Sequence, residues 1–179
     1  MIRIFAGKYR SRNIETPEEG TLPTKNRVRE AMMSAVTPFL KDAVVLDLFA
    51  GSGALGIEAL SRGAKKCYFV DVSPKACAIV KNNLKTLREE NAVVLNRSYE
   101  EALKQFDEPF DLVFLDPPYA MKQSYQESID LLCARGLLKE ECAVVVEYEG
   151  ELELQVDAFP FRRDYTYGKT KVILLKKQS

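Results

Sequence analysis

The chain of 179 residues contains no histidine, and its four cysteines form no Cys-x-x-Cys pair. Without histidine, a Ser-His or Cys-His nucleophile pair and a His-Glu metal motif are excluded. Cysteines with this spacing give poor support to a zinc site or a disulfide framework. We therefore expect no bound metal, and reduced, mostly buried thiols at Cys67, Cys77, Cys133 and Cys142.

The sequence also lacks a long apolar run and a signal-peptide pattern. Asp42, Asp47 and several glycines interrupt the most apolar stretch, which is therefore too short to span a membrane. Residues 1–4 do not resemble the start of a signal peptide. The length and ordinary composition fit one domain with at most a small appendage. We expect a cytoplasmic protein that acts as a monomer.

Positive and negative charges balance over the whole chain but are unevenly distributed along it. Residues 1–14 contain four basic side chains and no acid, and residues 162–179 contain six basic side chains against Asp164. Basic ends on an acidic body indicate contact with a polyanion at one region of the surface. Solubilising tails remain the alternative explanation.

The first 40 residues form an N-terminal unit of their own in the sequence pattern. Residues 2–6 and 12–16 are typical of two short strands around a turn, and a loop over 17–25 follows. Apolar residues spaced by three and four then predict a helix over 26–39. We expect residues 1–40 to be an RNA-binding extension and residues 41–179 to be the catalytic domain.

The remainder of the chain alternates short apolar strands with amphipathic helices, which is typical of a mostly parallel sheet covered on both faces. The final two segments face each other across the turn at Gly168, so the last strand should enter the sheet antiparallel. The predicted fold is therefore α/β, a three-layer, Rossmann-like sandwich with a seven-stranded sheet. The predicted strands are 43–48, 66–71, 92–96, 110–115, 142–147, 161–167 and 171–176, and the predicted helices are 54–62, 74–87, 99–105 and 123–134.

A glycine-rich turn follows the first strand of this domain, with the spacing Gly51-x-Gly53-x-x-Gly56. Such glycines let the backbone approach a ligand closely at the start of a helix, and the pattern fits a dinucleotide as well as other adenosine cofactors. Asp71 ends the next strand, 18 residues after Gly53, close to the spacing at which an acid binds ribose hydroxyls. An N-terminal cap for helix 74–87 is the alternative role for Asp71.

The tetrapeptide Asp116-Pro117-Pro118-Tyr119 ends a later strand. Two prolines stiffen the backbone and remove two N–H donors, which leaves the Asp116 carboxylate and nearby carbonyls as acceptors. Acceptors beside an aromatic ring suit an exocyclic amine of a nucleobase, whose N–H groups they accept while the ring stacks on the base. The alternative is a purely structural role, in which the prolines stiffen a turn and the tyrosine packs against the protein.

These motifs resemble known families. Asp47-Leu48-Phe49-Ala50-Gly51-Ser52-Gly53 resembles motif I of the class I S-adenosylmethionine-dependent methyltransferases, and Asp116–Tyr119 resembles the motif of those that methylate exocyclic amines. Nearly the whole chain resembles the ribosomal small subunit methyltransferase D family, in particular through Pro23-Thr24, Arg27-Val28-Arg29-Glu30, the block 50–64 and Tyr167-Gly168. That family makes N2-methylguanosine in bacterial small-subunit ribosomal RNA. The resemblance implies S-adenosylmethionine as cofactor and ribosomal RNA, or the small ribosomal subunit particle, as partner.

The implied site residues fall into three groups. Asp116, Pro117, Pro118 and Tyr119 are expected to be catalytic, with Asp116 and the Pro117 carbonyl accepting the amine N–H groups and Tyr119 stacking on the base. The expected cofactor-binding residues are Asp47, Phe49, Ala50, Gly51, Ser52, Gly53, Asp71, Val72, Ser98, Tyr99 and Asp116. The expected phosphate contacts are Lys8, Arg10, Arg12, Arg27 and Arg29.

Three positions depart from the family pattern. Leu22 and Asn26 stand where arginine and aspartate are usual, and Ser98 stands where an acidic or amide residue often receives the adenine amino group. Asn96 or a backbone group is the alternative for that last role.

Other functions remain open on the sequence alone. The glycine pattern fits a nicotinamide-dependent oxidoreductase, and a Tyr165-x-x-x-Lys169 pair has the spacing of some reductases, although it should span a hairpin rather than a helix. Methylation of adenine N6 in DNA or RNA uses the same tetrapeptide. A non-catalytic RNA-binding or assembly factor is the third alternative.

Overall fold

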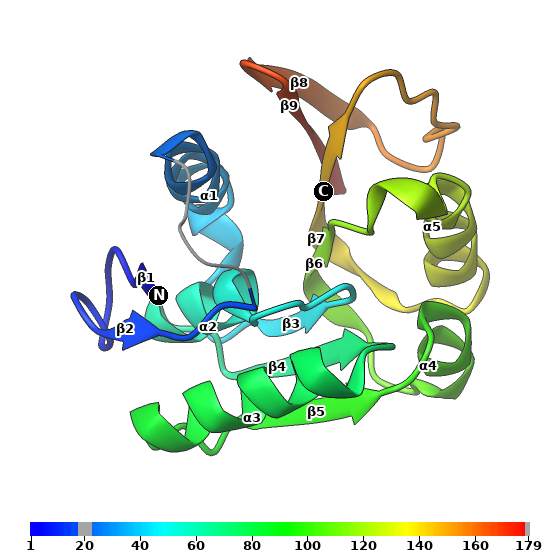
Figure 1. The fold of residues 1–179 in the computed structure, drawn as a ribbon. Coiled ribbons are helices and arrows are strands. Elements are labelled where there is room, and N and C mark those ends of the chain that lie inside the picture. Colours follow the sequence, from blue (N-terminus) through cyan, green and yellow to red (C-terminus); the bar gives the residue numbers. More distant parts are fainter. Residues whose placement is uncertain (18–22, 178–179) are drawn as a thin grey trace.

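The computed structural model describes residues 1–17 and 23–177, apart from the side chains of residues 23, 24 and 119. Leu22 and most of the predicted loop 17–25 lie outside the described residues. In the described part, a seven-stranded sheet has the order β5-β4-β3-β6-β7-β9-β8 (Figure 1). The strands are β1 (Ile2–Arg3), β2 (Asn13–Ile14), β3 (Val44–Asp47), β4 (Lys66–Asp71), β5 (Ala92–Asn96), β6 (Phe110–Leu115), β7 (Leu138–Glu149), β8 (Phe161–Tyr167) and β9 (Thr170–Lys177).

Five neighbouring strands, β5, β4, β3, β6 and β7, run parallel, and β9 is antiparallel to both β7 and β8. The predicted α/β class, the seven strands and the antiparallel last strand are therefore confirmed. The chain proceeds outward from β3 in one direction and then returns to β6 on the other side of β3. This reversal of strand order lies between β3 and β6, and open α/β sheets bind their ligands at such a point.

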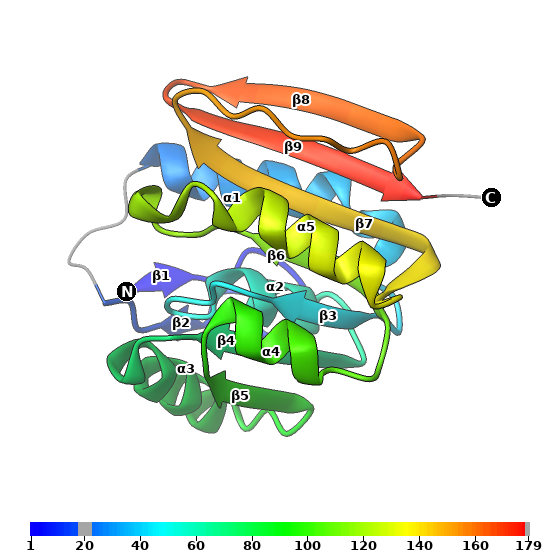
Figure 2. The same cartoon turned by 90° about the vertical axis from the view of Figure 1, so that its right-hand side faces the viewer.

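Helices cover both faces of the sheet (Figures 1 and 2). One hydrophobic cluster joins the N-terminal hairpin, α1, α2 and α3 to one face, and a second cluster joins α4 and α5 to the other. None of the described helices is long and apolar enough to cross a membrane. The helices are α1 (Pro23–Ala35), α2 (Ala54–Ser61), α3 (Pro74–Leu87), α4 (Tyr99–Gln105) and α5 (Ser124–Ala134), with short 3₁₀ turns η1 (Thr37–Phe39) and η2 (Tyr119–Met121).

Local sequence explains the best-predicted helix. In α3, the Ser73 hydroxyl accepts the Ala76 N–H at 3.2 Å, and Pro74 occupies the first helical position. Arg88 then ends the helix in the left-handed conformation. The prediction was less accurate at the N-terminus, where the helix placed at 26–39 begins instead at Pro23 and ends at Ala35, with Pro38 in the 3₁₀ turn η1.

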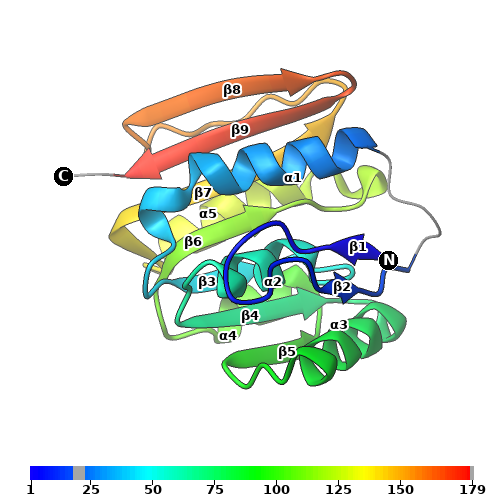
Figure 3. The same cartoon turned by 90° about the vertical axis from the view of Figure 1, so that its left-hand side faces the viewer.

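The N-terminal hairpin is fixed to the end of α2 by a dense set of hydrogen bonds. The Ser61 hydroxyl donates to the Ala6 carbonyl at 2.6 Å and accepts the Tyr9 N–H at 2.9 Å. Gly7 has φ +86°, and a Cβ there would lie 1.9 Å from the Ser61 carbonyl oxygen. Only glycine fits so close an approach with this backbone conformation. The two strands, predicted at 2–6 and 12–16, are short because turn contacts replace ladder pairing beyond β1 and β2 (Figure 3).

Candidate active site

Two loops meet at the point where the strand order reverses. β3 ends at Asp47 and continues into the glycine-rich turn, whereas its neighbour β6 ends at Leu115 and continues into Asp116-Pro117-Pro118. Because β3 and β6 are parallel, both loops emerge at the same edge of the sheet. The two motifs singled out in the sequence therefore share one site.

A cavity of about 580 Å³ lies over the glycine-rich turn. Phe49, Ala50, Gly51 and Ser52 line one side of it, and Asp71 lies beside them. Gly51 has φ +57°, and a Cβ built there would meet no heavy atom within 4 Å, so the backbone of the turn is open to the cavity. These features fit the close approach of an adenosine cofactor.

Asp71 and Asp47 hold the turn in place from different sides. The two carboxylate oxygens of Asp71 accept the N–H groups of Gly51 and of Ser73, the N-cap residue of α3, each at 2.9 Å, and Asp71 also faces the cavity. Asp47 is only 2% exposed, and its carboxylate accepts the Gly56 N–H at 3.1 Å. Burial raises the pKa of Asp47 to about 7. Asp47 is not among the described residues that line the cavity; it supports the turn from below, and its expected contact with the cofactor stays a prediction.

The predicted residues after β4 and β5 differ in their placement. Val72 is 64% exposed directly after Asp71, where an apolar surface suits a flat base. Ser98 is the N-terminal cap of α4, with its hydroxyl accepting the Glu101 N–H at 3.2 Å. The Asn96 amide donates to the carbonyls of Asp71 and Val72, both at 3.0 Å, which places it beside Asp71, the expected ribose-binding residue. Asn96 and Ser98 both remain predictions for the residue that receives an adenine amino group.

Tyr99 is buried rather than exposed to a ligand. It is 5% exposed, and its hydroxyl donates to the Glu127 carboxylate. Its ring lies 5.6 Å from the ring of Phe49, which lines the cavity. The Tyr99 side chain thus supports Phe49 from behind, and its expected contact with the cofactor stays a prediction.

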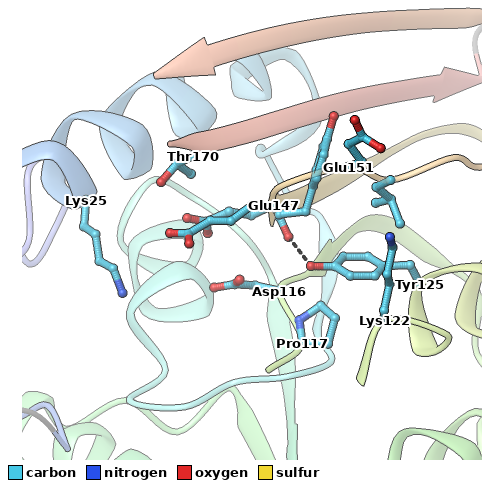
Figure 4. Close-up of a pocket in the computed structure, with 11 residues that line it drawn as sticks. Lys25, Asp116, Pro117, Lys122, Tyr125, Glu147, Glu151 and Thr170 are labelled. Carbon is cyan, nitrogen blue, oxygen red and sulfur yellow. Dashed lines mark hydrogen bonds between the residues drawn. The ribbon is translucent and has the colours of Figure 1, made fainter. Parts of the chain in front are cut away.

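A second cavity, of about 280 Å³, adjoins the first at Asp116 (Figure 4). The two cavities share Lys25, Asp116, Pro117 and Glu147. The Pro118 carbonyl accepts the Met121 N–H at 2.9 Å and so begins η2, which leaves the turn between Asp116 and Pro118 facing the cavities. The side chain of Tyr119 lies outside the described residues. The remaining residues of the second cavity are Lys122, Tyr125, Tyr148, Glu149, Glu151, Leu152 and Thr170.

Asp116 and Glu147 form a pair of carboxylates where the two cavities meet. Glu147 lies near the end of β7 and within hydrogen-bonding reach of Asp116. The cleft walls limit the hydration of Asp116 and, together with the negative charge of Glu147, raise its pKa well above the usual range. Limited hydration likewise raises the pKa of Glu147, and the ammonium of Lys25 opposes both shifts. The pair therefore retains a proton to a higher pH than solvated carboxylates do.

The predicted phosphate contacts of the hairpin lie away from this site. We refer to Lys8, Arg10 and Arg12 as the hairpin cluster. Lys8 pairs with Glu89 at 2.9 Å, and an Arg12 N–H donates to the Thr86 carbonyl at 3.3 Å, both beyond or near the end of α3. α2 begins at the cavity and ends where the hairpin docks, about 12 Å away for eight residues. The hairpin cluster therefore lies towards the opposite end of the sheet, so its expected phosphate contacts would be with RNA at a distance from the reacting base.

Arg27 and Arg29 differ from each other in exposure. Arg27 is exposed on α1, as a phosphate contact requires. Arg29 is only 6% exposed, and its guanidinium donates to the Arg3 carbonyl at 2.6 Å and lies 4.5 Å over the Phe5 ring. Burial lowers the pKa of Arg29. Arg29 therefore has little exposed surface for RNA outside the site: it holds β1 against α1 and also lines the larger cavity, and its expected phosphate contact stays a prediction.

Three exposed lysines surround the cavities instead, and we refer to them as the rim cluster. Lys25 and Lys122 line the second cavity, and Lys169 directly precedes its wall residue Thr170. Sequence reasoning missed these lysines and Glu147. Glu147 could have been found, because it ends the predicted strand 142–147, and ligands bind beyond the carboxyl ends of such strands.

No group of three or more His, Cys, Asp or Glu side chains that could hold a metal occurs among the residues for which placement is given. Tyr165 lies on β8 and Lys169 lies in the turn that follows, so the pair does not share a helix as the reductase alternative requires. The site thus consists of a glycine-rich turn, an acid at a neighbouring strand end and a carboxylate-proline turn between two cavities.

Comparison with known proteins agrees with this geometry. The structure of a T. thermophilus 16S rRNA N2 G1207 methyltransferase, in complex with AdoMet and guanosine, matches with a TM-score of 0.72 at 20% identity, over 90% of this chain and 45% of that chain. The fold is thus that of the class I S-adenosylmethionine-dependent methyltransferases.

Closer relatives define the family. The family model described as Conserved hypothetical protein 95 matches residues 2–176. The ribosomal RNA small subunit methyltransferase D of Haemophilus influenzae is 40% identical over 158 residues, which cover 86% of this chain and 81% of that protein. The solved structure of Escherichia coli yhhF has a TM-score of 0.88 at 35% identity, over 99% of this chain and 98% of that one. The chain belongs to the ribosomal RNA small subunit methyltransferase D family.

Proposed function

We propose that this enzyme transfers a methyl group from S-adenosylmethionine to the exocyclic N2 amine of a guanine in small-subunit ribosomal RNA. The observation that carries the proposal is the junction of two cavities at Asp116 and Pro117, one over the glycine-rich turn and one beside it. Family membership supports the choice of ribosomal RNA. We further propose that the enzyme is a cytoplasmic monomer.

The residues around the larger cavity fit the cofactor. The open backbone at Gly51 admits a close ligand, Asp71 offers carboxylate oxygens to ribose hydroxyls, and exposed Val72 offers an apolar surface to adenine. S-adenosylmethionine supplies a methyl group on a positively charged sulfonium when it is bound. Asp116 lines both cavities, so it is the acceptor nearest to both reactants.

The chemistry requires orientation more than a strong base. The lone pair of the guanine amine is conjugated into the ring, so the amine is a weak nucleophile. Hydrogen bonds from the amine to Asp116 and the Pro117 carbonyl would localise that lone pair and direct it, and such orientation is worth up to ~7–11 kcal/mol in favourable cases. The N2 proton leaves as the N–C bond forms, and an Asp116 carboxylate oxygen receives it. The raised pKa of Asp116 makes it a better proton acceptor than a solvated aspartate.

The target base has to leave its helix or loop to reach this site. Unstacking takes a few kcal/mol, and stacking on an aromatic ring such as Tyr119 returns roughly 1–3 kcal/mol per base. Contacts between phosphates and basic side chains have to supply the remainder. We assign these contacts to the rim cluster and to Arg27, because they are exposed and the rim cluster surrounds the cavities.

The test is mass spectrometry of ribosomal RNA nucleosides from cells with and without this gene. Loss of one N2-methylguanosine is expected on deletion, and its return is expected when the wild-type gene is supplied. Asp116→Ala should restore less than a few per cent of the modification while calorimetry shows near-normal cofactor binding. Restoration by Asp116→Ala would show that another group accepts the amine protons, and an unchanged nucleoside profile after deletion would refute the function itself.

A further inference from the structure

Two acidic side chains, rather than one, face the space where the target base has to sit. Asp116 follows β6 and Glu147 lies near the end of the neighbouring strand β7, and both line both cavities. Figure 4 shows the two carboxylates side by side, with the Lys25 ammonium extending towards them from α1. The catalytic motif accounts for Asp116 but gives no role to Glu147.

The backbone around Glu147 is held firmly. Its carbonyl accepts the hydroxyl of Tyr125 at 2.7 Å, and Tyr125 is itself only 6% exposed. On the other side, Glu147 pairs with Val172 of the antiparallel strand β9. A side chain on so well fixed a strand end is preorganised to accept a hydrogen bond from a ligand.

The common bases differ in what they offer to two adjacent acceptors. Guanine presents two neighbouring donors, the N1–H and the N2 amine, followed by the O6 acceptor. Adenine presents its N6 amine beside N1, which is an acceptor and would face a carboxylate without a proton between them. A pair of carboxylates therefore fits guanine and opposes adenine.

We propose that Glu147 is the residue that selects guanine: its carboxylate accepts the N1–H while Asp116 accepts the neighbouring N2–H. This inference rests on the proposed function and names the part of the site that recognises its substrate.

The electrostatics of the Asp116 and Glu147 carboxylates support this assignment. Limited hydration and then the negative charge of Glu147 raise the pKa of Asp116, and limited hydration raises the pKa of Glu147, so the two adjacent groups tend to hold a proton between them. The two N–H donors of guanine can take the place of that shared proton and hold both groups in their ionised form. An adenine ring offers only one donor group in this position.

The experiment changes the hydrogen-bonding groups of the target base. The methylated guanine is first located by mass spectrometry, and small subunits are then reconstituted with guanine, 2-aminopurine or inosine at that position. 2-Aminopurine keeps the N2 amine but lacks both the N1 proton and O6, and inosine keeps the N1 proton and O6 but lacks the amine; the comparison with Glu147→Gln separates the N1 contribution from the loss of O6. Methyl transfer is measured as kcat/KM for the wild type, for Glu147→Gln and for the control Glu140→Gln, which removes an exposed carboxylate from β7 outside the site.

We expect the wild type and Glu140→Gln to prefer guanine over 2-aminopurine by on the order of 100-fold or more, because an unprotonated N1 leaves a carboxylate without a donor. Glu147→Gln should lower kcat/KM on guanine by roughly 10- to 150-fold, the loss of one charged hydrogen bond. It should affect 2-aminopurine much less, because the glutamine amide can donate to N1. The preference for guanine should then fall at least about tenfold, while calorimetry shows unchanged cofactor binding.

Equal losses on guanine and 2-aminopurine in Glu147→Gln would overturn the selection role and leave Glu147 as a support for Asp116. Equal rates of the wild type on guanine and 2-aminopurine would overturn it without any variant. Methyl transfer to inosine would instead refute the N2 reaction, and with it the role proposed for Glu147. The three results are distinct, so failure of the recognition model can be told from failure of the proposed function.

Discussion

The buried carboxyl of Asp47 makes a sharp prediction about how stability depends on pH. Asp47 is 2% exposed beneath the glycine-rich turn, and burial raises its pKa from 3.8 to about 7. Between these two values the folded state binds more protons than the unfolded state. The stability due to this group should therefore be greatest at low pH, decline as the pH rises from about 4 to about 7, and level off above the folded pKa.

The magnitude follows from the two pKa values. With 1.36 kcal/mol for each unit, raising the pH from about 5 to about 8 should remove roughly 2–3 kcal/mol of stability through Asp47 alone. Asp47→Asn abolishes this titration but keeps an oxygen that accepts the Gly56 N–H. The free energy of unfolding of the variant, relative to the wild type, should therefore improve by about 2–3 kcal/mol over this pH interval.

Urea unfolding followed by circular dichroism at several pH values between about 5 and 8 measures this difference. Asp107→Asn is the matched control, because it removes an exposed carboxylate and should follow the wild-type curve. Comparison at each pH cancels the other titrating groups, including Asp116 and Glu147. If Asp47→Asn and the wild type ran parallel over the whole range, Asp47 would be ionised in the folded protein and the reasoning from burial would be wrong.

Two further predictions concern the N-terminal hairpin and the RNA surface. Gly7→Ala should destabilise the protein by about 3 kcal/mol, because its Cβ would lie 1.9 Å from the Ser61 carbonyl oxygen and its backbone has φ +86°. Gly136→Ala, with φ +63° in open space, should cost only about 1 kcal/mol. Thermal and urea unfolding compare the two variants, and equal losses of stability would contradict the steric argument. Alanine at all three positions of the rim cluster should weaken binding to ribosomal RNA and make the slope of log K against log salt concentration shallower by up to about 2–3. Alanine at all three positions of the hairpin cluster should leave that slope near the wild-type value. The reverse result would assign the RNA contact to the hairpin.

Most of the fold could be predicted from sequence because its elements are specified locally. α3 was predicted at its true bounds from Ser73, Pro74 and an apolar repeat, and β5, β6 and α4 were also predicted without error. The range predicted for β7, 142–147, was too short, because the polar residues at the ends of this strand adopt strand conformation only through pairing with a neighbouring strand. The ladder with β9 runs from Cys142 to Glu149, and local composition carries no sign of that partner.

The site residues that lie at strand ends were predicted from the sequence, whereas those whose role depends on tertiary packing were not. Gly51, Asp71 and Asp116 all lie where the strand-end rule placed them. Tyr99 has a residue type suited to ligands, but it is only 5% exposed and packs against Phe49, whereas Arg29 lines the larger cavity although it is only 6% exposed. Residue type and helix periodicity do not reveal which neighbour will bury a side chain at the edge of an apolar face.

The basic hairpin illustrates why a charge cluster in sequence does not locate a binding surface. Net positive charge over residues 1–14 indicated contact with a polyanion, and that inference concerned charge alone. Which end of the sheet receives those charges depends on where the turn docks, and Gly7 docks it at Ser61, the far end of α2 from the cavity. Basic side chains there can contact only RNA that extends well beyond the target nucleotide. A base drawn into the site between Asp116 and Glu147 must be held by side chains at the carboxyl end of the sheet, and the rim cluster provides the positive charge there.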